Sequence, residues 1–292
     1  MISEPIMKKV KGYGVDIQLA IWKGTGKQVL CVHGITANCR CWDLVASALS
    51  PKYQVLAMDL RGRGLSEKPP TGYSLEQHVR DIGCLIEAMG LEKVVLMGHS
   101  LGAFISLAFG AKYPERVGGL VLIDGGGQLT EEQWDKVALA IKPSLYRLGR
   151  IFPSSDAYIE AMKSTTYLHP WSSAIENCYR YEVEEVEGGV KTNIDPAHIQ
   201  EEAENIRKVV SSGFYGEVTA NVLILRATEG LISQDDLLLP EAAVEEMLQK
   251  ISNARSVDIV GTNHFSILFQ PNEMRDQTIL EFFSTKGWSS GS

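Results

Sequence analysis

The chain contains 292 residues, of which 45% are hydrophobic and 22% are charged. This length is enough for one large domain with an insertion, and no second core is required. The formal net charge of −8 and the isoelectric point near 5.4 argue against a nucleic acid or an anionic membrane as partner, because both attract clustered lysine and arginine.

Short apolar runs alternate along the chain with amphipathic stretches, which predicts a mainly parallel β-sheet with helices on both faces. The chain starts with two extended segments that are joined by a turn at residues 12–14. Ser74 and Gln77 form a capping-box pattern that predicts the start of a helix. The further expected strands span 28–32, 55–58, 94–97, 117–123, 222–225 and 255–260, and the further expected helices span 103–113, 240–251 and 273–283.

The expected strand 28–32 ends in His33-Gly34-Ile35-Thr36. A turn at this place can direct the backbone N–H of Ile35 at an oxyanion that develops during acyl transfer. We assign the second donor to the backbone N–H of Leu101, which follows Ser100 in the chain. The sequence therefore predicts an oxyanion hole made of two main-chain groups.

Gly98-His99-Ser100-Leu101-Gly102 lies between an apolar run and a helix-like stretch, the strand–turn–helix context of a nucleophile elbow. A serine on so sharp a turn has a strained backbone, so the residues two places before and after it must lack a Cβ atom. Gly98 and Gly102 satisfy this requirement. We expect the side chain of His99 to be directed away from Ser100.

A serine hydroxyl is a poor nucleophile at neutral pH, so a neutral imidazole must accept its proton. His264 lies in Gly261-Thr262-Asn263-His264-Phe265, directly after the last expected strand, where a loop can reach over the carboxyl edge of the sheet. His33 belongs to the oxyanion turn and is less suitable. We therefore predict that His264 is the general base.

Four motifs together resemble the α/β-hydrolase superfamily: His33-Gly34 after one strand, the segment 59–66 (DLRGRGLS) after the next, the elbow at 98–102, and the late segment 261–265 (GTNHF). The resemblance covers about residues 10–125 and 220–283. It implies a mainly parallel eight-stranded sheet and a serine hydrolase whose triad follows the order serine, acid, histidine. Within the superfamily, the chain is most similar to cofactor-free bacterial carboxylesterases and to related amide and C–C hydrolases.

Two acids follow suitable strands and can orient His264: Asp124 and Glu229. The superfamily more often uses the later position, in a G-x-x-D turn, but here Gly230 stands where that aspartate would align. Some members carry the acid after the earlier strand. We therefore favour Asp124, with Glu229 as the alternative acid and Asp235 or Asp236 as less suitable candidates.

Residues 126–219 interrupt the strand–helix alternation and are too numerous for a simple crossover. We expect them to form a helical cap, inserted after the sixth strand, over a core made of 1–125 and 220–286. Residues 287–292 are expected to be a disordered tail. The aromatic residues of the cap are candidates for ligand contact but fit cap packing better: Trp134, Tyr146, Phe152, Tyr158, Tyr167 and Trp171.

We expect neither a cofactor nor a metal. The five cysteines are odd in number and contain no C-x-x-C pair, and the glycine clusters do not fit a dinucleotide-binding motif. The first residues contain no apolar signal core, and no apolar run approaches the ~18 residues that cross a bilayer, so we expect a cytoplasmic protein without a membrane partner.

Together these features predict a serine carboxylesterase that hydrolyses small to medium esters through an acyl-enzyme intermediate. An amidase, a lactonase or a C–C bond hydrolase with the same triad is the alternative, and so is a ligand receptor of low turnover on the same fold. The expected partner is a small-molecule ester, and the chain is expected to be a monomer or a homodimer.

Overall fold

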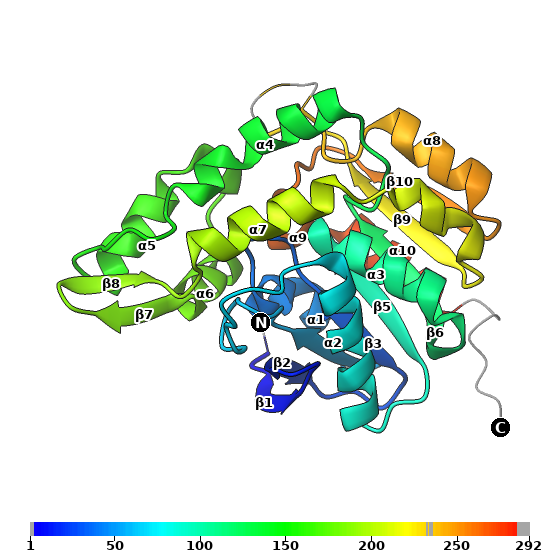
Figure 1. Ribbon diagram of the computed structural model, residues 1–292, viewed down its shortest axis with the longest axis horizontal. Helices are drawn as coiled ribbons and strands as arrows, with labels where there is room; N and C mark the ends of the chain where they lie inside the picture. Colours follow the sequence, from blue (N-terminus) through cyan, green and yellow to red (C-terminus); the bar gives the residue numbers. More distant parts are fainter. Residues whose placement is uncertain (1–2, 232, 234–235, 285–292) are drawn as a thin grey trace.

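The computed structural model describes residues 3–231, 233 and 236–284, so the expected tail at 287–292 lies outside the described residues. An eight-stranded sheet forms the centre of the molecule in the order β1-β2-β4-β3-β5-β6-β9-β10 (Figure 1). β1 pairs antiparallel with β2, and β2 with β4, whereas all other neighbours are parallel. The mainly parallel eight-stranded sheet is thus confirmed. Its strands are β1 (Ile6–Lys11), β2 (Asp16–Trp22), β3 (Gln28–Val32), β4 (Gln54–Met58), β5 (Val94–His99), β6 (Val117–Ile123), β9 (Val222–Ala227) and β10 (Ala254–Ile259).

Helices cover both faces of this sheet, because successive side chains of its central strands are buried on opposite sides. On one face, Leu30 and Val32 of β3 pack in a core with α2 (Leu75–Ala88), α3 (Leu101–Lys112) and α8 (Glu241–Lys250). On the other face, Val29 and Cys31 pack with α1 (Asp43–Leu49), α9 (Ser266–Phe269) and α10 (Glu273–Ser284). The short 3₁₀ helices are η1 (Cys39–Trp42), η2 (Pro114–Arg116), η3 (Thr166–Leu168) and η4 (Ser211–Glu217).

The segment between β6 and β9 extends over the carboxyl edge of the sheet and beyond one side of the core (Figure 1). It contains α4 (Glu131–Leu145), α5 (Ser155–Lys163), α6 (Ser173–Tyr181), β7 (Val183–Val186), β8 (Gly189–Thr192) and α7 (Pro196–Arg207). Besides the helices expected there, this segment contains an antiparallel hairpin, which β7 and β8 form. Gly188 and Gly189 allow this turn, since both have positive φ values, 88° and 146°. After α7, η4 returns to the core, where Tyr215 is fully buried against the α3 side of the sheet.

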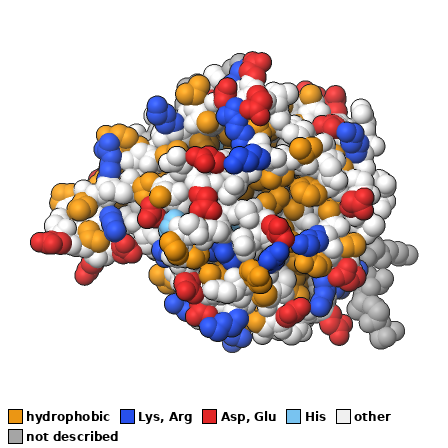
Figure 2. All heavy atoms as spheres, viewed as in Figure 1, with side chains coloured by type: hydrophobic (Ala, Val, Ile, Leu, Met, Phe, Trp, Pro, Cys, Tyr) orange, Lys and Arg blue, Asp and Glu red, His pale blue; other side chains and the backbone are white. Residues whose placement is uncertain are grey.

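The visible face of the molecule carries acidic and basic side chains interspersed, and hydrophobic side chains gather near its centre (Figure 2). Within the described residues, no helix is both long enough and apolar enough to cross a membrane.

Candidate active site

Ser100 lies at the junction of β5 and α3, on a backbone with φ 55° and ψ −121°. Residues other than glycine rarely adopt this backbone conformation, so the surrounding structure must hold Ser100 in it. The two flanking glycines leave room for the turn. A Cβ atom on Gly98 would lie 2.1 Å from the carbonyl oxygen of Gly102, and one on Gly102 would lie 2.0 Å from that of Val32. A Cβ atom at either position would therefore collide with the backbone, as the sequence predicts for a nucleophile elbow.

Gly34, in the turn after β3, lies directly beside Ser100. A Cβ atom on Gly34 would lie 3.2 Å from Ser100 Cβ and 3.6 Å from Ser100 Oγ. Because glycine has no side chain, the space next to the hydroxyl stays open to a bound substrate.

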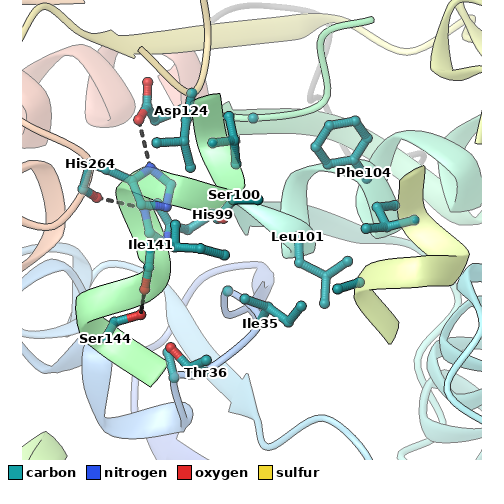
Figure 3. Close-up of a pocket in the computed structure, with 18 of the residues that line it drawn as sticks. Ile35, Thr36, His99, Ser100, Leu101, Phe104, Asp124, Ile141, Ser144 and His264 are labelled. Atoms are coloured by element: carbon teal, nitrogen blue, oxygen red, sulfur yellow. Dashed lines mark hydrogen bonds and ion pairs between the residues drawn. The ribbon is translucent and has the colours of Figure 1, made fainter. Parts of the chain in front are cut away.

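The expected oxyanion donors, Ile35 and Leu101, both line the cavity that contains Ser100 (Figure 3). In the described chain, neither backbone N–H donates to a recorded hydrogen bond. Leu101 is the first residue of α3, so its N–H also lies at the positive end of the helix dipole. Both groups are therefore free to donate to a bound oxyanion.

The orientation of the Ile35 N–H follows from the planar peptide that joins Gly34 and Ile35. The carbonyl oxygen of Gly34 accepts hydrogen bonds from His33 Nδ1 at 2.7 Å and from the N–H of Ala37 at 3.2 Å. His33 Nε2 accepts from the N–H of Leu60 at 3.0 Å, which places the ring proton on Nδ1. Burial lowers the pKa of His33 to about 3, so the ring is neutral at physiological pH. Its two hydrogen bonds hold the turn after β3 in place.

His264 and Asp124 meet above the carboxyl edge of the sheet. His264 Nδ1 donates to Asp124 Oδ2 at 2.7 Å, and both side chains are buried (Figure 3). Asp124 follows β6 with a positive φ of 45°, and its Oδ1 accepts from the N–H of Ala227 at 3.2 Å. Gly125 permits the close approach of this loop, since a Cβ atom there would lie 2.5 Å from the carbonyl oxygen of Ser100.

The other candidate acids lie apart from this pair. Glu229 is exposed, and the hydrogen bond recorded for it joins its own N–H to the carbonyl oxygen of Thr262. The carboxylate of Asp236 accepts from the backbone N–H groups of Leu231 and Ser233. Asp235 lies outside the described residues.

The side chain of His99 is directed at His264. The two rings stack with centroids 4.4 Å apart, and His99 Nε2 donates to the carbonyl oxygen of His264 at 2.9 Å. His99 continues the alternation of β5 on the face that carries Met97, and the His264 loop folds onto this face. Burial, followed by the neighbouring His264, holds the pKa of His99 well below its usual value.

Residues 27–271 match the family model of the alpha/beta hydrolase fold. The chain belongs to the α/β-hydrolase family. This membership supports a hydrolase activity and agrees with the resemblance inferred from the four motifs.

Relatives of this α/β-hydrolase are distant but cover most of its length. 2-(Acetamidomethylene)succinate hydrolase of Mesorhizobium japonicum is 29% identical over 243 residues, which are 83% of this chain and 83% of that protein. 3-Hydroxybutyrate-oligomer hydrolase of Cupriavidus necator is 26% identical over 257 residues, covering 84% and 85%. The crystal structure of E-2-(acetamidomethylene)succinate hydrolase has a TM-score of 0.84 and 27% identity, and it covers 96% of this chain and 100% of that one.

Ser100, His264 and Asp124 all line one cavity of about 300 Å³. In the described chain, no hydrogen bond joins Ser100 Oγ to His264, and such bonds in hydrolases often tighten only when substrate is bound. The cap helices α4 and α7 supply the roof. The walls of the cavity are mostly apolar and include Ile35, Leu101, Phe104, Leu129, Trp134, Val137, Ile141, Ile206, Phe265 and Leu268.

Of the six cap aromatics considered, Trp134 is the one that lines this cavity in the described structure. Tyr158 is fully buried inside the cap, and Tyr146 is largely exposed. Sequence reasoning missed Val137, Ile141 and the residues of α7. The first two could have been found, because with Trp134 they follow helical spacing after a capping box at Thr130.

Within the described residues, no group of three His, Cys, Asp or Glu side chains is placed to hold a metal ion. The cysteines of the oxyanion region, Cys39 and Cys41, are buried, and burial raises the pKa of both thiols well above its usual value. A thiol in this state is a packing group rather than a nucleophile.

Proposed function

We propose that the protein is a serine hydrolase that cleaves uncharged carboxylic esters with an apolar acyl group, through an acyl-enzyme intermediate. The observation that carries this proposal is the cavity itself. It brings a strained serine, a buried His264–Asp124 pair and two unoccupied main-chain donors to one apolar space. This combination fits nucleophilic acyl transfer better than binding alone.

In the first step, Ser100 Oγ attacks the ester carbonyl carbon while His264 Nε2 accepts the hydroxyl proton. The carbonyl π electrons move to oxygen, and the Ile35 and Leu101 N–H groups donate to the resulting oxyanion. The imidazolium that forms is stabilised by Asp124, which accepts a hydrogen bond from Nδ1 and stays ionised.

When the oxyanion collapses, the bond between the carbonyl carbon and the alcohol oxygen breaks. His264 returns its proton to that oxygen, so a neutral alcohol leaves and the acyl group stays on Ser100. Water then repeats the sequence with His264 as base. The carboxylic acid is released and the serine hydroxyl is restored.

The charges around the cavity support an uncharged substrate. Arg207 is the one lysine or arginine among its described lining residues, and it pairs with Glu131 and, at 2.8 Å, with Asp135. Its side chain is 38% exposed, at the outer edge of the roof. A substrate carboxylate inside the cavity would therefore lack a cationic partner, and burying it there would be costly.

An amide substrate is the second candidate, because the relatives include a hydrolase named for an acetamido compound. The same serine, base and oxyanion donors form an acyl-enzyme from an ester or an amide. The two differ in the leaving group, since an amine must be protonated before it departs.

A matched substrate set tests both candidates. We expect turnover of p-nitrophenyl esters from acetate to decanoate, with an optimum set by the cavity, and loss of turnover in Ser100→Ala. The p-nitroanilides of the same acids and a hemisuccinate ester complete the set. Preference for the anilide would replace the esterase proposal by the amidase, and preference for the hemisuccinate would contradict the uncharged substrate. Ligand binding without turnover of any member would favour the receptor.

A further inference from the structure

The short segment that carries the oxyanion donor is held by a chain of hydrogen bonds that starts in the cap. Arg147, two residues after the end of α4, donates from a terminal guanidinium nitrogen to the carbonyl oxygen of Thr36 at 2.8 Å. The planar peptide couples this carbonyl to the N–H of Ala37, which donates to the carbonyl oxygen of Gly34. A second planar peptide couples that carbonyl to the Ile35 N–H. Two peptide planes therefore connect Arg147 to the donor.

Arg147 is itself fixed inside the cap. It is buried, and its Nε donates to Glu182 at 2.6 Å while a terminal nitrogen donates to the same carboxylate at 3.0 Å. Tyr158 also donates to Glu182, and the guanidinium lies 5.2 Å from the ring centroid of Tyr179. A buried guanidinium with two parallel bonds to a carboxylate has little freedom to move.

The intervening peptide, between Ile35 and Thr36, is held by a second arginine. Arg63 Nε donates to the carbonyl oxygen of Ile35 at 2.9 Å. Arg63 pairs with Glu202 of α7, a buried carboxylate that also contacts His78 of α2. Each of the two arginines that hold the segment is thus paired with a glutamate of the cap.

We propose that the cap helps to build the oxyanion hole, with Arg147, held by Glu182, as a positioning residue for the Ile35 N–H. The Arg63–Glu202 pair has the same role for the adjacent peptide. This inference rests on the proposed function. It gives the insertion a part in transition-state stabilisation in addition to its part as the roof of the cavity.

The test compares Arg147→Met with Arg180→Met. Arg180 is also a cap arginine, but it pairs at the surface with Glu176 and Asp156 and has no recorded contact with residues 33–37. We expect Arg147→Met to lower kcat about 10-fold to 100-fold, because the donor is misdirected rather than deleted, with KM changed little. Arg180→Met should match the wild type, and Arg147→Lys should lie between the two.

Two inhibitors separate positioning from general damage. A trifluoromethyl ketone with the preferred acyl chain adds to Ser100 and forms an oxyanion, whereas the methyl ketone of the same chain reports ground-state binding. In Arg147→Met the affinity for the trifluoromethyl ketone should fall by the same factor as kcat/KM, and that for the methyl ketone should not. Glu182→Gln should show the same pattern to a smaller degree, and it serves if Arg147→Met does not fold.

An Arg147→Met enzyme with wild-type kcat, or one that loses affinity for both ketones equally, would overturn the inference whatever its melting temperature. A wild type without Ser100-dependent turnover would overturn the proposed function and this inference with it. The two failures are thus distinct, since the first requires an active wild type.

Discussion

The floor and the roof of the cavity present different kinds of group to a substrate. The floor consists of loops at the carboxyl edge of the sheet, where hydrogen bonds hold strained residues such as Ser100 and Asp124. The roof consists of α4 and α7, and most of the side chains that it turns toward the cavity are apolar, such as Trp134 beside Phe104. Hydrogen-bonded floor groups tolerate little change, whereas apolar walls lose only packing. We therefore expect changes in the floor to affect rate and changes in the apolar lining of the roof to affect substrate choice.

The largest effect should come from the floor. Ser100→Ala removes the nucleophile and should lower kcat at least about 10⁴-fold, because the remaining groups cannot form an acyl-enzyme. Hydrolysis of the best p-nitrophenyl ester measures this loss, and circular dichroism should show an unchanged fold. Residual activity within tenfold of the wild type would place the reaction on another residue.

The two candidate acids give the next largest difference. Asp124→Asn should lower kcat about 10³-fold to 10⁴-fold, because the amide no longer stabilises the His264 imidazolium. Glu229→Gln should leave kcat near the wild-type value, since the Glu229 side chain is exposed. The opposite result would transfer the role of the acid to Glu229.

Gly34 tests how closely the floor fits around the nucleophile. Gly34→Ala adds a methyl group 3.6 Å from Ser100 Oγ and should lower kcat/KM about 10-fold to 100-fold by displacing the substrate carbonyl. Gly83→Ala is the matched control, because its added Cβ atom would meet nothing within 4 Å. Equal activity of the two variants would show that the space beside Ser100 is not used.

The buried imidazoles of the floor should make it sensitive to acid. The folded state binds a proton on His33 only near pH 3, whereas the unfolded state binds one below about pH 6.5, so acid favours unfolding. The contribution of such a neutral ring to the free energy of unfolding should be complete above pH 6.5. It should be lost toward pH 3, by up to about 1.4 kcal/mol per pH unit for each such group. Urea unfolding from pH 8 to 5 measures this slope.

His33→Gln should reduce the slope of the unfolding free energy against pH by the contribution of one titrating group, because glutamine keeps a donor and an acceptor but does not titrate. The exposed residue His169 supplies the control, and His169→Gln should keep the wild-type slope. An unchanged slope in His33→Gln would contradict a buried neutral ring at this position.

The smallest effect on rate should come from the roof. Trp134→Ala enlarges the cavity next to Phe104 and should shift the best acyl chain to a greater length, while kcat for acetate changes little. Each further buried methylene can contribute up to about 0.8 kcal/mol, roughly fourfold in kcat/KM. The ester series from acetate to decanoate measures this shift. An unchanged optimum, with loss of rate on all esters, would contradict the division between floor and roof.

The floor could be predicted largely from the sequence because it is local. His33, Ser100 and His264 each follow an expected strand, and parallel strands bring their carboxyl ends to one edge of the sheet. The choice between Asp124 and Glu229 stayed open at that level, since both follow strands. The distance of 2.7 Å from His264 Nδ1 to Asp124 Oδ2 distinguishes them.

The stacking of His99 on His264 was not foreseen, and neither were the contacts of Arg147. The His99–His264 contact and the hydrogen bond from Arg147 to Thr36 each join residues more than a hundred positions apart, and neither has a local pattern. The hairpin β7–β8 was missed as well, because its strands are short and lack a clear alternation of polar and apolar residues.

The sequence by itself determined the order of the core strands, the elbow around Ser100 and the turn at His33-Gly34. These features depend on periodicity and on the steric freedom of glycine, which act between close neighbours. Only the tertiary structure decided which acid meets His264, which helices roof the cavity and which charges hold the oxyanion segment. Such choices depend on how surfaces distant in the chain fit together, because a buried charge is stable only where the fold supplies its partner.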